Sequence, residues 1–439
     1  MSELPIWEDL TTIQQWVAAC EVDGAPSPDQ YVDFDAPQLD ASGQALGRGL
    51  RGVPIRETIL RHIRVRPPFV NSARVLFAGF RGSGKTTELT RLGDDLKSVG
   101  YRVIRTDAGD YDTFTRAQSI EEMTFVLAAA IGSAADAPQL DGGSVFDRMR
   151  DLLKGFQLRD ANLDFSAFNL QFAIRDNLTF RARLREAFRT RPELLRDWFH
   201  GFIGEIVAAD PQRRPLVIIV DGLEKYRVPY GEIAETYRDV ARMYADHASW
   251  LALPGCHVVY CVPPLLSTLE RNLRDFYQVV PTMASVRIHG RPPARVPYRP
   301  GYGALREAMG RRVSLHRLFG PDWEGCADAI VAASGGHVRL MFKLLQDAIV
   351  ETFGRKSYIS PDDLARLFRP NEGISTRDVG SLLRHVWDGG DLMQLDDAQF
   401  SALAIALDQH MVLAYENGER WYDVAPLAEH MVGPAPADP

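Results

Sequence analysis

Short runs of consecutive apolar residues are the first regular feature of the chain. Residues 216–220 are five apolar residues, mostly β-branched, and residues 257–262 form a similar run that stops at two prolines. Runs of this length are typical of strands buried on both faces of a parallel sheet. Weaker apolar or alternating patterns predict three more strands, at residues 74–78, 101–105 and 285–288.

Before the first of these strands and between the others, apolar residues recur at the spacing of amphipathic helices. This spacing predicts helices at residues 55–65, 87–92, 120–132, 180–189, 192–208, 232–250 and 265–277. Residues 158–174 alternate instead, which predicts an inserted β-hairpin. Strands that alternate with helices indicate an α/β fold, with a parallel sheet between two layers of helices.

After a proline-rich loop at residues 290–301, the pattern becomes helical. Four short helices are expected, at residues 304–312, 323–333, 338–353 and 361–367, and they form an all-α lid over residues 301–370. Two more helices, at 379–387 and 398–407, precede two alternating runs that are separated by Asn417-Gly418, a strong hairpin signal. Helices followed by a hairpin predict a winged-helix domain at residues 371–432. An N-terminal extension at residues 1–47, a core at 48–290 and a disordered tail at 433–439 complete the expected organisation.

Composition narrows the class of protein. The chain has 439 residues, a net charge of −8 and an apolar fraction of 46%, which fit a soluble protein of two or three domains that is not a general nucleic-acid binder. The sequence contains no secretion signal and no apolar stretch long enough to span a membrane, so a cytoplasmic location is expected. The cysteines lack metal-ligand spacing and suit a reducing compartment: Cys20, Cys256, Cys261 and Cys326.

The strongest chemical signal is the glycine-rich segment at residues 79–86, which reads G-x-x-x-x-G-K-T and lies between a predicted strand and a predicted helix. This is the phosphate-binding loop of P-loop NTPases. Glycines let several backbone N–H groups converge on an anion, and the helix dipole adds to the attraction. Lys85 is expected to reach the β- and γ-phosphates and to assist catalysis, and the Thr86 hydroxyl is expected to ligate Mg²⁺. The expected nucleotide-binding residues are Gly79, Arg81, Gly82, Ser83, Gly84, Lys85, Thr86 and Thr87.

The second signal is Asp221, which closes the buried run at residues 216–220. The carboxyl ends of parallel strands line the ligand crevice of an α/β sheet, so Asp221 is expected to be the Walker B aspartate that holds Mg²⁺. Glu224 is a candidate to polarise the attacking water, or it is a loop acid paired with an arginine. At the end of the strand at 257–262, Cys261 or a backbone group is the candidate sensor of the γ-phosphate.

Several arginines are candidates for the same site. Arg339 is expected in the first turn of a lid helix, from which it could reach the γ-phosphate. Arg271 and Arg274 could act on the nucleotide of a neighbouring subunit. For each of these three, an ordinary surface arginine is the alternative. The segment at residues 48–74 is basic, and it either flanks the base and ribose or is a solvated face.

Taken together, these motifs resemble the AAA+ and STAND-like P-loop ATPases, in particular the origin-recognition-type branch with a helical lid and a winged helix. The resemblance rests on residues 79–86, on 216–224 and on Ser334-Gly335-Gly336 with Arg339. Residues 81–89 also resemble a segment of bacterial ATPases in signalling and anti-phage conflict systems, and this second resemblance implies a role in bacterial anti-phage defence. The resemblance implies a P-loop NTPase core followed by an all-α lid and a winged-helix domain.

Two departures from that resemblance point to slow hydrolysis. Many AAA+ enzymes carry a catalytic glutamate directly after the Walker B aspartate, whereas this chain has Gly222. The sensor position after Tyr260 also lacks the usual Asn or Thr. Both departures favour a STAND-type switch over a motor.

The sequence leaves two functions open. ATP is favoured over GTP, because the chain lacks an Asn-Lys-x-Asp or Thr-Lys-x-Asp motif. The first function is an ATP-driven switch that acts on a partner protein or oligomer, with or without hydrolysis. The second is an ATP-dependent DNA-binding loader or regulator, with contacts in residues 175–196 or 287–317. Residues 371–432 carry three arginines, no lysine and eleven acids, so a protein partner is favoured over DNA.

Overall fold

The computed structural model describes residues 10–22, 25–37, 49–135, 144–155, 173–227, 229–270, 272–354, 357–368, 370, 376–389, 392 and 397–432. The chain forms two compact units. The helical unit comprises Met1–Ile55, Phe80–Thr87 and Met283–Pro439. The sheet unit comprises Arg56–Gly79 and Glu88–Thr282.

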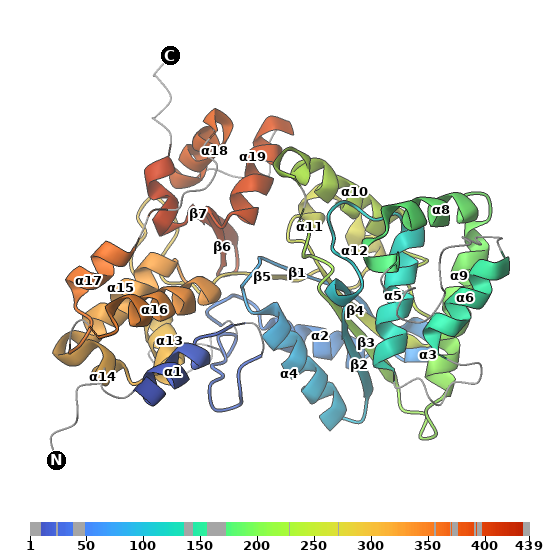
Figure 1. The fold of residues 1–439 in the computed structure, drawn as a ribbon, viewed down its shortest axis with the longest axis horizontal. Helices are drawn as coiled ribbons and strands as arrows, with labels where there is room; N and C mark the ends of the chain where they lie inside the picture. The colour runs from blue at the N-terminus through green and yellow to red at the C-terminus, as the bar shows by residue number, and fades with distance from the viewer. Residues whose placement is uncertain are drawn as a thin grey trace. The chain divides into compact units, whose positions relative to one another are not determined.

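The centre of the sheet unit is a five-stranded sheet in the order β2-β3-β4-β1-β5 (Figure 1). Its strands are β1 (Arg74–Gly79), β2 (Arg102–Asp107), β3 (Leu216–Asp221), β4 (Cys256–Val262) and β5 (Thr282–Met283). The pairs β2–β3, β3–β4 and β4–β1 are parallel, and Val75 and Val279 form a parallel bridge on the far side of β1. The prediction of a P-loop-type α/β core with a parallel sheet is therefore confirmed.

Burial on both faces explains the continuous apolar sequence of the two strands β3 and β4. Every residue of β3 and of β4 is buried. A strand that is covered on both faces has no polar side to alternate with, so its sequence becomes a continuous apolar run. β2 is only partly buried, and its sequence alternates accordingly.

Helices flank this sheet along the chain. They are α2 (Ile55–Arg64), α3 (Pro68–Asn71), α4 (Lys85–Ser98), α5 (Ile120–Ala134), α6 (Val145–Gly155), α8 (Leu178–Phe188), α9 (Pro192–Ala208), α10 (Ile233–Asp246), α11 (Leu266–Leu269) and α12 (Leu273–Phe276). α5 begins with a capping box, in which Ser119 and Glu122 satisfy each other's backbone N–H groups. It packs against β2 and β3 and also contacts α6, α8 and α9, which explains why most of its residues are buried.

Two elements predicted for this part of the chain differ in the structure, and a third lies almost wholly outside the described residues. The single helix expected at residues 265–277 is divided into α11 and α12, because Glu270 has an extended backbone with φ −122° and ψ 98°. Residues 285–288 are not a strand, since the amides of residues 285–287 bond to carbonyls of the helical unit and not to the sheet. The hairpin expected at 158–174 lies outside the described residues except for Ala173 and Ile174, which are helical.

The helical unit contains α1 (Leu10–Ala19), α13 (Arg299–Gly310), α14 (Leu315–Phe319), α15 (Trp323–Ser334), α16 (Val338–Thr352), α17 (Pro361–Leu367), α18 (Arg377–Trp387) and α19 (Asp397–Asp408). A single apolar core joins α13, α15 and α16 to Ile13 and Trp16 of α1. The hairpin predicted around Asn417-Gly418 is present as β6 (Val412–Glu416) and β7 (Arg420–Val424), which pair antiparallel.

The segment that follows β5 connects separate parts of the helical unit. The Ser285 amide donates to Ala414 O at 2.8 Å, the Val286 amide to Gly336 O at 3.1 Å and the Arg287 amide to Leu50 O at 3.0 Å. Three successive amides thus bond to the C-terminal hairpin, to the turn between α15 and α16 and to the N-terminal region. Because these donors are occupied in this way, the segment cannot add a strand to the sheet.

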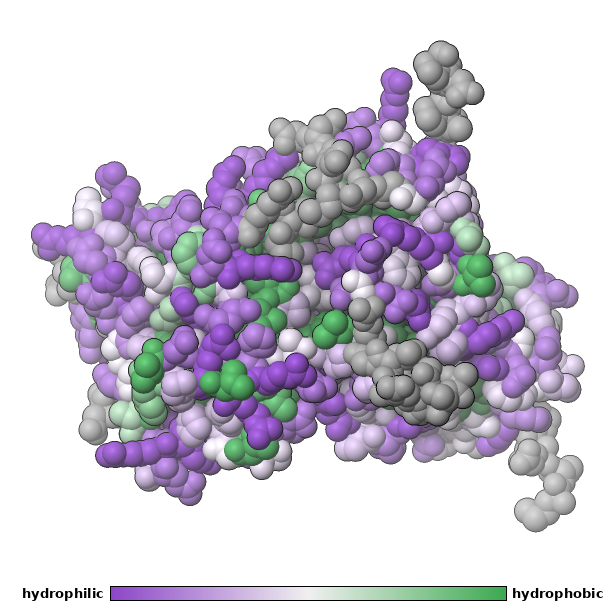
Figure 2. Space-filling view, turned by 180° about the vertical axis from the view of Figure 1, so that it is seen from behind, coloured by the Kyte–Doolittle hydropathy of each residue, from purple (hydrophilic) through white to green (hydrophobic). Residues whose placement is uncertain are grey.

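The surface gives no sign of a membrane segment in the parts of the chain that are described. Each helix there is too short or too polar to cross a bilayer. On the face drawn in Figure 2, most of the surface is hydrophilic and apolar residues occur in small separate groups.

Candidate nucleotide-binding site

The predicted phosphate loop connects β1 to α4, in the strand–turn–helix arrangement that its motif requires. Gly82 and Gly84 have positive φ angles of 78° and 99°, which residues with a Cβ adopt only under strain. Inside the loop, the Phe80 carbonyl accepts hydrogen bonds from the Ser83 amide at 3.2 Å and from Lys85 Nζ at 2.9 Å. Lys85 is buried, with an exposed fraction of 5%, and its ammonium group is hydrogen-bonded to the backbone of the loop.

A buried arginine of the N-terminal region contacts the same loop. Arg51 Nη1 lies 3.5 Å from Ser83 O, and Arg51 Nε donates to Asp35 Oδ1 at 2.8 Å. The Arg51 guanidinium also lies 5.5 Å from the centre of the Phe34 ring. From the sequence, Arg51 was only one member of a basic segment. Its pairing partner, Asp35, lies in sequence that resembles a loop and gave no signal of a role at this site.

The N-terminus of α16 is the third contact of the loop. Arg339 is in the first turn of α16, as predicted, and a Cβ added to Gly82 would lie 2.9 Å from the Arg339 Cβ. The Arg339 guanidinium donates to Val22 O at 3.2 Å. His337, the N-cap of α16, places its Nε2 2.8 Å from Arg81 O. The sequence pattern did not single out His337, although its position directly before an apolar helix is that of a cap.

The electrostatic surroundings of His337 favour a neutral ring. Burial lowers the pKa of His337 to about 4, and the charges of Arg339 and Lys85 act in the same direction. Its neighbour His410, whose ring centre is 4.8 Å away, has a pKa lowered to about 3 by burial first and by nearby charges second. Both rings therefore carry no charge at neutral pH.

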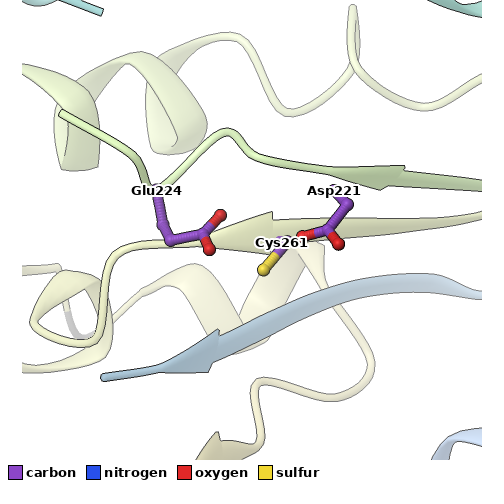
Figure 3. A group of neighbouring side chains, drawn as sticks. All are labelled: Asp221, Glu224 and Cys261. Atoms are coloured by element: carbon purple, nitrogen blue, oxygen red, sulfur yellow. The ribbon is translucent and has the colours of Figure 1, made fainter. Parts of the chain in front are cut away.

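The second group of predicted residues lies at the carboxyl end of the sheet. Asp221 is the last residue of β3, and it is opposite Asp107 of β2 in the strand register. Asp221 Oδ1 accepts a hydrogen bond from the Gly222 amide at 2.8 Å. A ligand atom from each of Asp221, Glu224 and Cys261 lies within 4.8 Å of the other two, and Figure 3 shows the Glu224 carboxylate pointing toward Cys261.

Asp107 and Lys225 belong to this end of the sheet as well. Lys225 Nζ donates to Asp107 Oδ2 at 2.5 Å. Burial alone lowers the pKa of Lys225, but the bond to Asp107 and the charges of Asp221 and Glu224 outweigh it, and the net pKa is raised. The sequence missed Asp107 because the strand predicted at 101–105 ended two residues early.

The geometry around Gly222 accounts for the missing glutamate after Asp221. Gly222 has a φ angle of +84°, and a Cβ at this position would lie 2.0 Å from Asp107 Oδ1. Any larger residue would therefore collide with the Asp107 side chain and be strained in its backbone. In this chain, a glutamate directly after Asp221 is sterically excluded.

The donor atoms at the end of the sheet fit a magnesium ion only in part. Mg²⁺ prefers oxygen ligands, which Asp221 and Glu224 offer. The Cys261 thiol is a soft ligand that Mg²⁺ does not favour. Asp221 is buried to 98% and Glu224 only partly, so the two carboxylates differ in their access to solvent.

The remaining candidates are divided between the two units. Lys85, Thr86 and Arg339 belong to the helical unit, whereas Asp221 and Glu224 belong to the sheet unit. Arg274 is an exposed residue of α12, and Arg271 lies outside the described residues. All four cysteines are described, and each is a buried thiol.

Solved structures of ORC and Cdc6 proteins align with this chain over most of its length. The ORC2 protein of Aeropyrum pernix, solved as ADPNP–ADP complexes, is 11% identical, with a TM-score of 0.41, and the match covers 92% of this chain and 96% of that one. The Drosophila ORC bound to DNA is 11% identical, with a TM-score of 0.40 and coverages of 97% and 92%. Cdc6p of Pyrobaculum aerophilum is 12% identical, with a TM-score of 0.37 and coverages of 85% and 91%. No protein-family model and no curated protein matches the sequence.

Proposed function

We propose that the chain binds ATP with Mg²⁺ and hydrolyses it slowly, as a switch that acts on a partner protein or an oligomer. The observation that carries this proposal is the phosphate loop, with its two positive-φ glycines directly before α4. The loop follows the carboxyl end of β1, and Asp221 ends β3 of the same sheet. Ligands of α/β sheets bind at this end, which supports a shared role for the two motifs.

Each residue has a distinct task in this proposal. The N–H groups of the loop surround the phosphates, and Lys85 neutralises the β- and γ-phosphate charge. Thr86 and Asp221 hold Mg²⁺, which when bound supplies charge neutralisation at the phosphates. Glu224 is the group that orients the attacking water, because it is the second carboxylate of the cluster that Asp221 forms with Cys261. Arg339 stabilises the γ-phosphate from the start of α16.

The proposal of a slow switch rests on the end of β3. Gly222 occupies the position of the usual catalytic glutamate, and Asp107 leaves no room for a side chain there. Glu224 follows after a turn and is only partly buried. A base that is less tightly positioned transfers protons less efficiently, which favours slow turnover. Nothing in the site or the comparisons supports a role in anti-phage defence.

A protein partner is favoured over DNA, because many of the arginines in the two candidate DNA regions form ion pairs with acids. In the region at 175–196, ion pairs join Arg175 to Asp176, Arg181 to Asp112, Arg185 to Glu122, Arg189 to Glu186 and Arg196 to Asp197. In the region at 287–317, they join Arg291 to Glu419, Arg295 to Asp423, Arg299 to Asp328, Arg306 to Glu324 and Arg311 to Glu307. Cations that are already paired release fewer counterions from DNA.

Helices α18 and α19 with the hairpin β6–β7 are therefore proposed to form an acidic winged helix that faces a protein. The alternative, a DNA-binding loader of origin-recognition type, predicts measurable duplex binding at about 50 mM salt that weakens steeply as salt rises. Binding of that kind, measured by fluorescence anisotropy, would favour the alternative.

The central test compares two variants. Lys85→Ala should weaken ATP binding about 10- to 100-fold, because one charge-assisted contact to phosphate is lost. Asp221→Asn should retain more of the ATP affinity but reduce phosphate release about 100-fold, since the Mg²⁺ ligand is altered. Calorimetric titration with ATP and a phosphate-release assay measure the two effects. Unchanged ATP affinity in Lys85→Ala would refute the proposal.

A further inference from the structure

His337 makes two hydrogen bonds that together fix the state of its ring. Its Nδ1 accepts from the Leu340 amide at 3.1 Å, which caps the N-terminus of α16. Its Nε2 lies 2.8 Å from the Arg81 carbonyl oxygen. Because Nδ1 acts as the acceptor, the proton of the neutral ring is on Nε2, which donates to Arg81 O. The ring is 2% exposed, so both bonds are protected from water.

The bond to Arg81 O has a consequence for the next residue of the phosphate loop. In a planar trans peptide, the carbonyl of residue 81 and the N–H of residue 82 point in opposite directions. When His337 holds the Arg81 carbonyl, the Gly82 N–H is turned to the side of the peptide away from His337. In a phosphate loop, the N–H groups must face the anion and the carbonyls must face away from it.

Gly82 and the imidazole ring of His337 are also in close van der Waals contact. Gly82 has a φ angle of +78°, and a Cβ at that position would lie 2.7 Å from His337 Cε1. The loop backbone is therefore packed directly against the imidazole ring. A small movement of the ring would have to be followed by the loop or would break the bond to Arg81 O.

A second histidine supports the first. His410 lies between α19 and β6, and its ring centre is 4.8 Å from that of His337, with an interplanar angle of 44°. Its own backbone is strained, with a φ angle of +55°. In the same region, the Tyr415 hydroxyl donates to Gly335 O at 2.5 Å, two residues before His337. The segment of α19, β6 and β7 thus contacts both His337 and the turn that carries it.

We propose that His337 is a positioning residue for the phosphate loop, and that His410 transmits the position of the C-terminal helix–hairpin segment to it. This rests on the proposed function, because it assigns regulation to the same loop. A partner that shifts α19 or the hairpin would alter the support of His337 and hence the orientation of the Gly82 N–H. The loop would then bind phosphate with an affinity that depends on the partner.

The test uses the difference in length between asparagine and histidine. Asparagine is a good N-cap, so His337→Asn keeps the cap of α16, but its side chain is too short to reach Arg81 O. His337→Ala loses both bonds. His337→Asn is therefore expected to be more stable than His337→Ala, because it keeps the cap of α16, while the affinity for ATP falls roughly three- to tenfold in both variants, the usual effect of one lost hydrogen bond. A purely structural role predicts lower stability in both variants, with an affinity for ATP in His337→Asn that equals that of the wild type.

Coupling to His410 is measured with a double-mutant cycle. His410→Ala should weaken ATP binding by about two- to threefold in the wild type and should have no further effect in His337→Asn. Additive effects would overturn the role of His410. Hydrogen exchange of the Gly82 amide, followed in the nucleotide-free protein, should be faster in His337→Asn than in the wild type. This measurement needs no ATP, so the inference on His337 can fail or stand separately from the proposed ATPase function.

Discussion

The phosphate loop and the carboxyl end of the sheet carry the two motifs of the proposed site, and they are held in place in different ways. At the end of the sheet, the register of β2, β3 and β4 places Asp107 opposite Asp221 and brings Cys261 beside it. The hydrogen bonds between the paired strands fix these positions. In the phosphate loop, by contrast, distant side chains hold the backbone, with Arg51 on Ser83 O and His337 on Arg81 O.

This difference in support determines how easily the backbone can move at the end of the sheet and in the phosphate loop. A ladder between buried strands can move only if several hydrogen bonds break together. A loop held by a few side chains can change with one contact. The end of the sheet is therefore suited to keep metal and water ligands fixed, whereas the loop is suited to respond to a signal.

The largest effect is expected from a substitution at the end of the sheet. Gly222→Ala forces a Cβ to within 2.0 Å of Asp107 Oδ1 at a φ angle of +84°. Strain and steric overlap should lower the free energy of unfolding by about 3 kcal/mol. Denaturant titration measures the loss. Gly201→Ala is the matched control, because a Cβ there meets nothing within 4 Å in the middle of α9, and it should be neutral or stabilising by up to about 1 kcal/mol. Equal effects of the two changes would contradict the tight packing at Gly222.

The next largest effect is the dependence of protein stability on pH, which reports on His337 and His410 beside the phosphate loop. His337 has a pKa of about 4 in the folded protein, below its ordinary value of 6.5. The unfolded chain binds a proton below about pH 6.5 and the folded chain does not until about pH 4, so stability falls as the pH drops through this window. Between pH 7 and pH 5, this histidine should account for a loss of about 2 kcal/mol. His410, with a pKa of about 3, adds to the loss in the same direction.

Denaturant titrations at pH 7 and pH 5 check this expectation. The charges of Arg339 and Lys85 disfavour protonation of both rings, and those of His337 and Arg81 also disfavour protonation of His410. His337→Asn should lose less stability than the wild type on acidification, because one of the two histidines is gone. If the variant and the wild type lose the same amount, His337 is not a source of the acid sensitivity.

The smallest effect on the proposed reaction is expected from Cys261→Ser. With Mg²⁺, its rate of hydrolysis should stay within about threefold of the wild type, since Mg²⁺ does not favour a thiol. With Cd²⁺, a thiophilic ion, the wild type should be inhibited at a concentration about tenfold lower than the variant. Cys256→Ala, at the opposite end of β4, is the control and should keep the sensitivity of the wild type. Loss of sensitivity in the control instead would place the cadmium site away from Cys261.

The elements that were predictable from the sequence are those whose pattern follows from local burial. β3 and β4 are apolar throughout because both of their faces are covered. The hairpin β6–β7 was predictable from Asn417-Gly418, because a tight turn needs residues that tolerate positive φ. The phosphate loop was predictable because its glycines and its lysine follow from the chemistry of phosphate binding.

What the sequence could not provide were contacts between distant segments. Nothing local to His337 or Arg81 relates the two, since 256 positions separate them along the chain. Asp107 was missed because the exact end of a half-buried strand is poorly marked by alternation. The strand predicted at 285–288 was wrong because its partners are distant in the sequence. The apolar alternation is present, but the amides of residues 285–287 bond to the helical unit and not to β1.

The three successive amides from Ser285 to Arg287 also bear on how this chain can evolve. Ser285 N–H depends on Ala414 O, and Gly335 O depends on the Tyr415 hydroxyl. A recombination event that exchanged the C-terminal helices and hairpin for those of another protein would leave these buried groups unpaired unless the new segment supplied equivalent partners. The C-terminal segment is thus inherited together with the residues that receive it, so a change of partner would have to arise through substitutions on its outer surface.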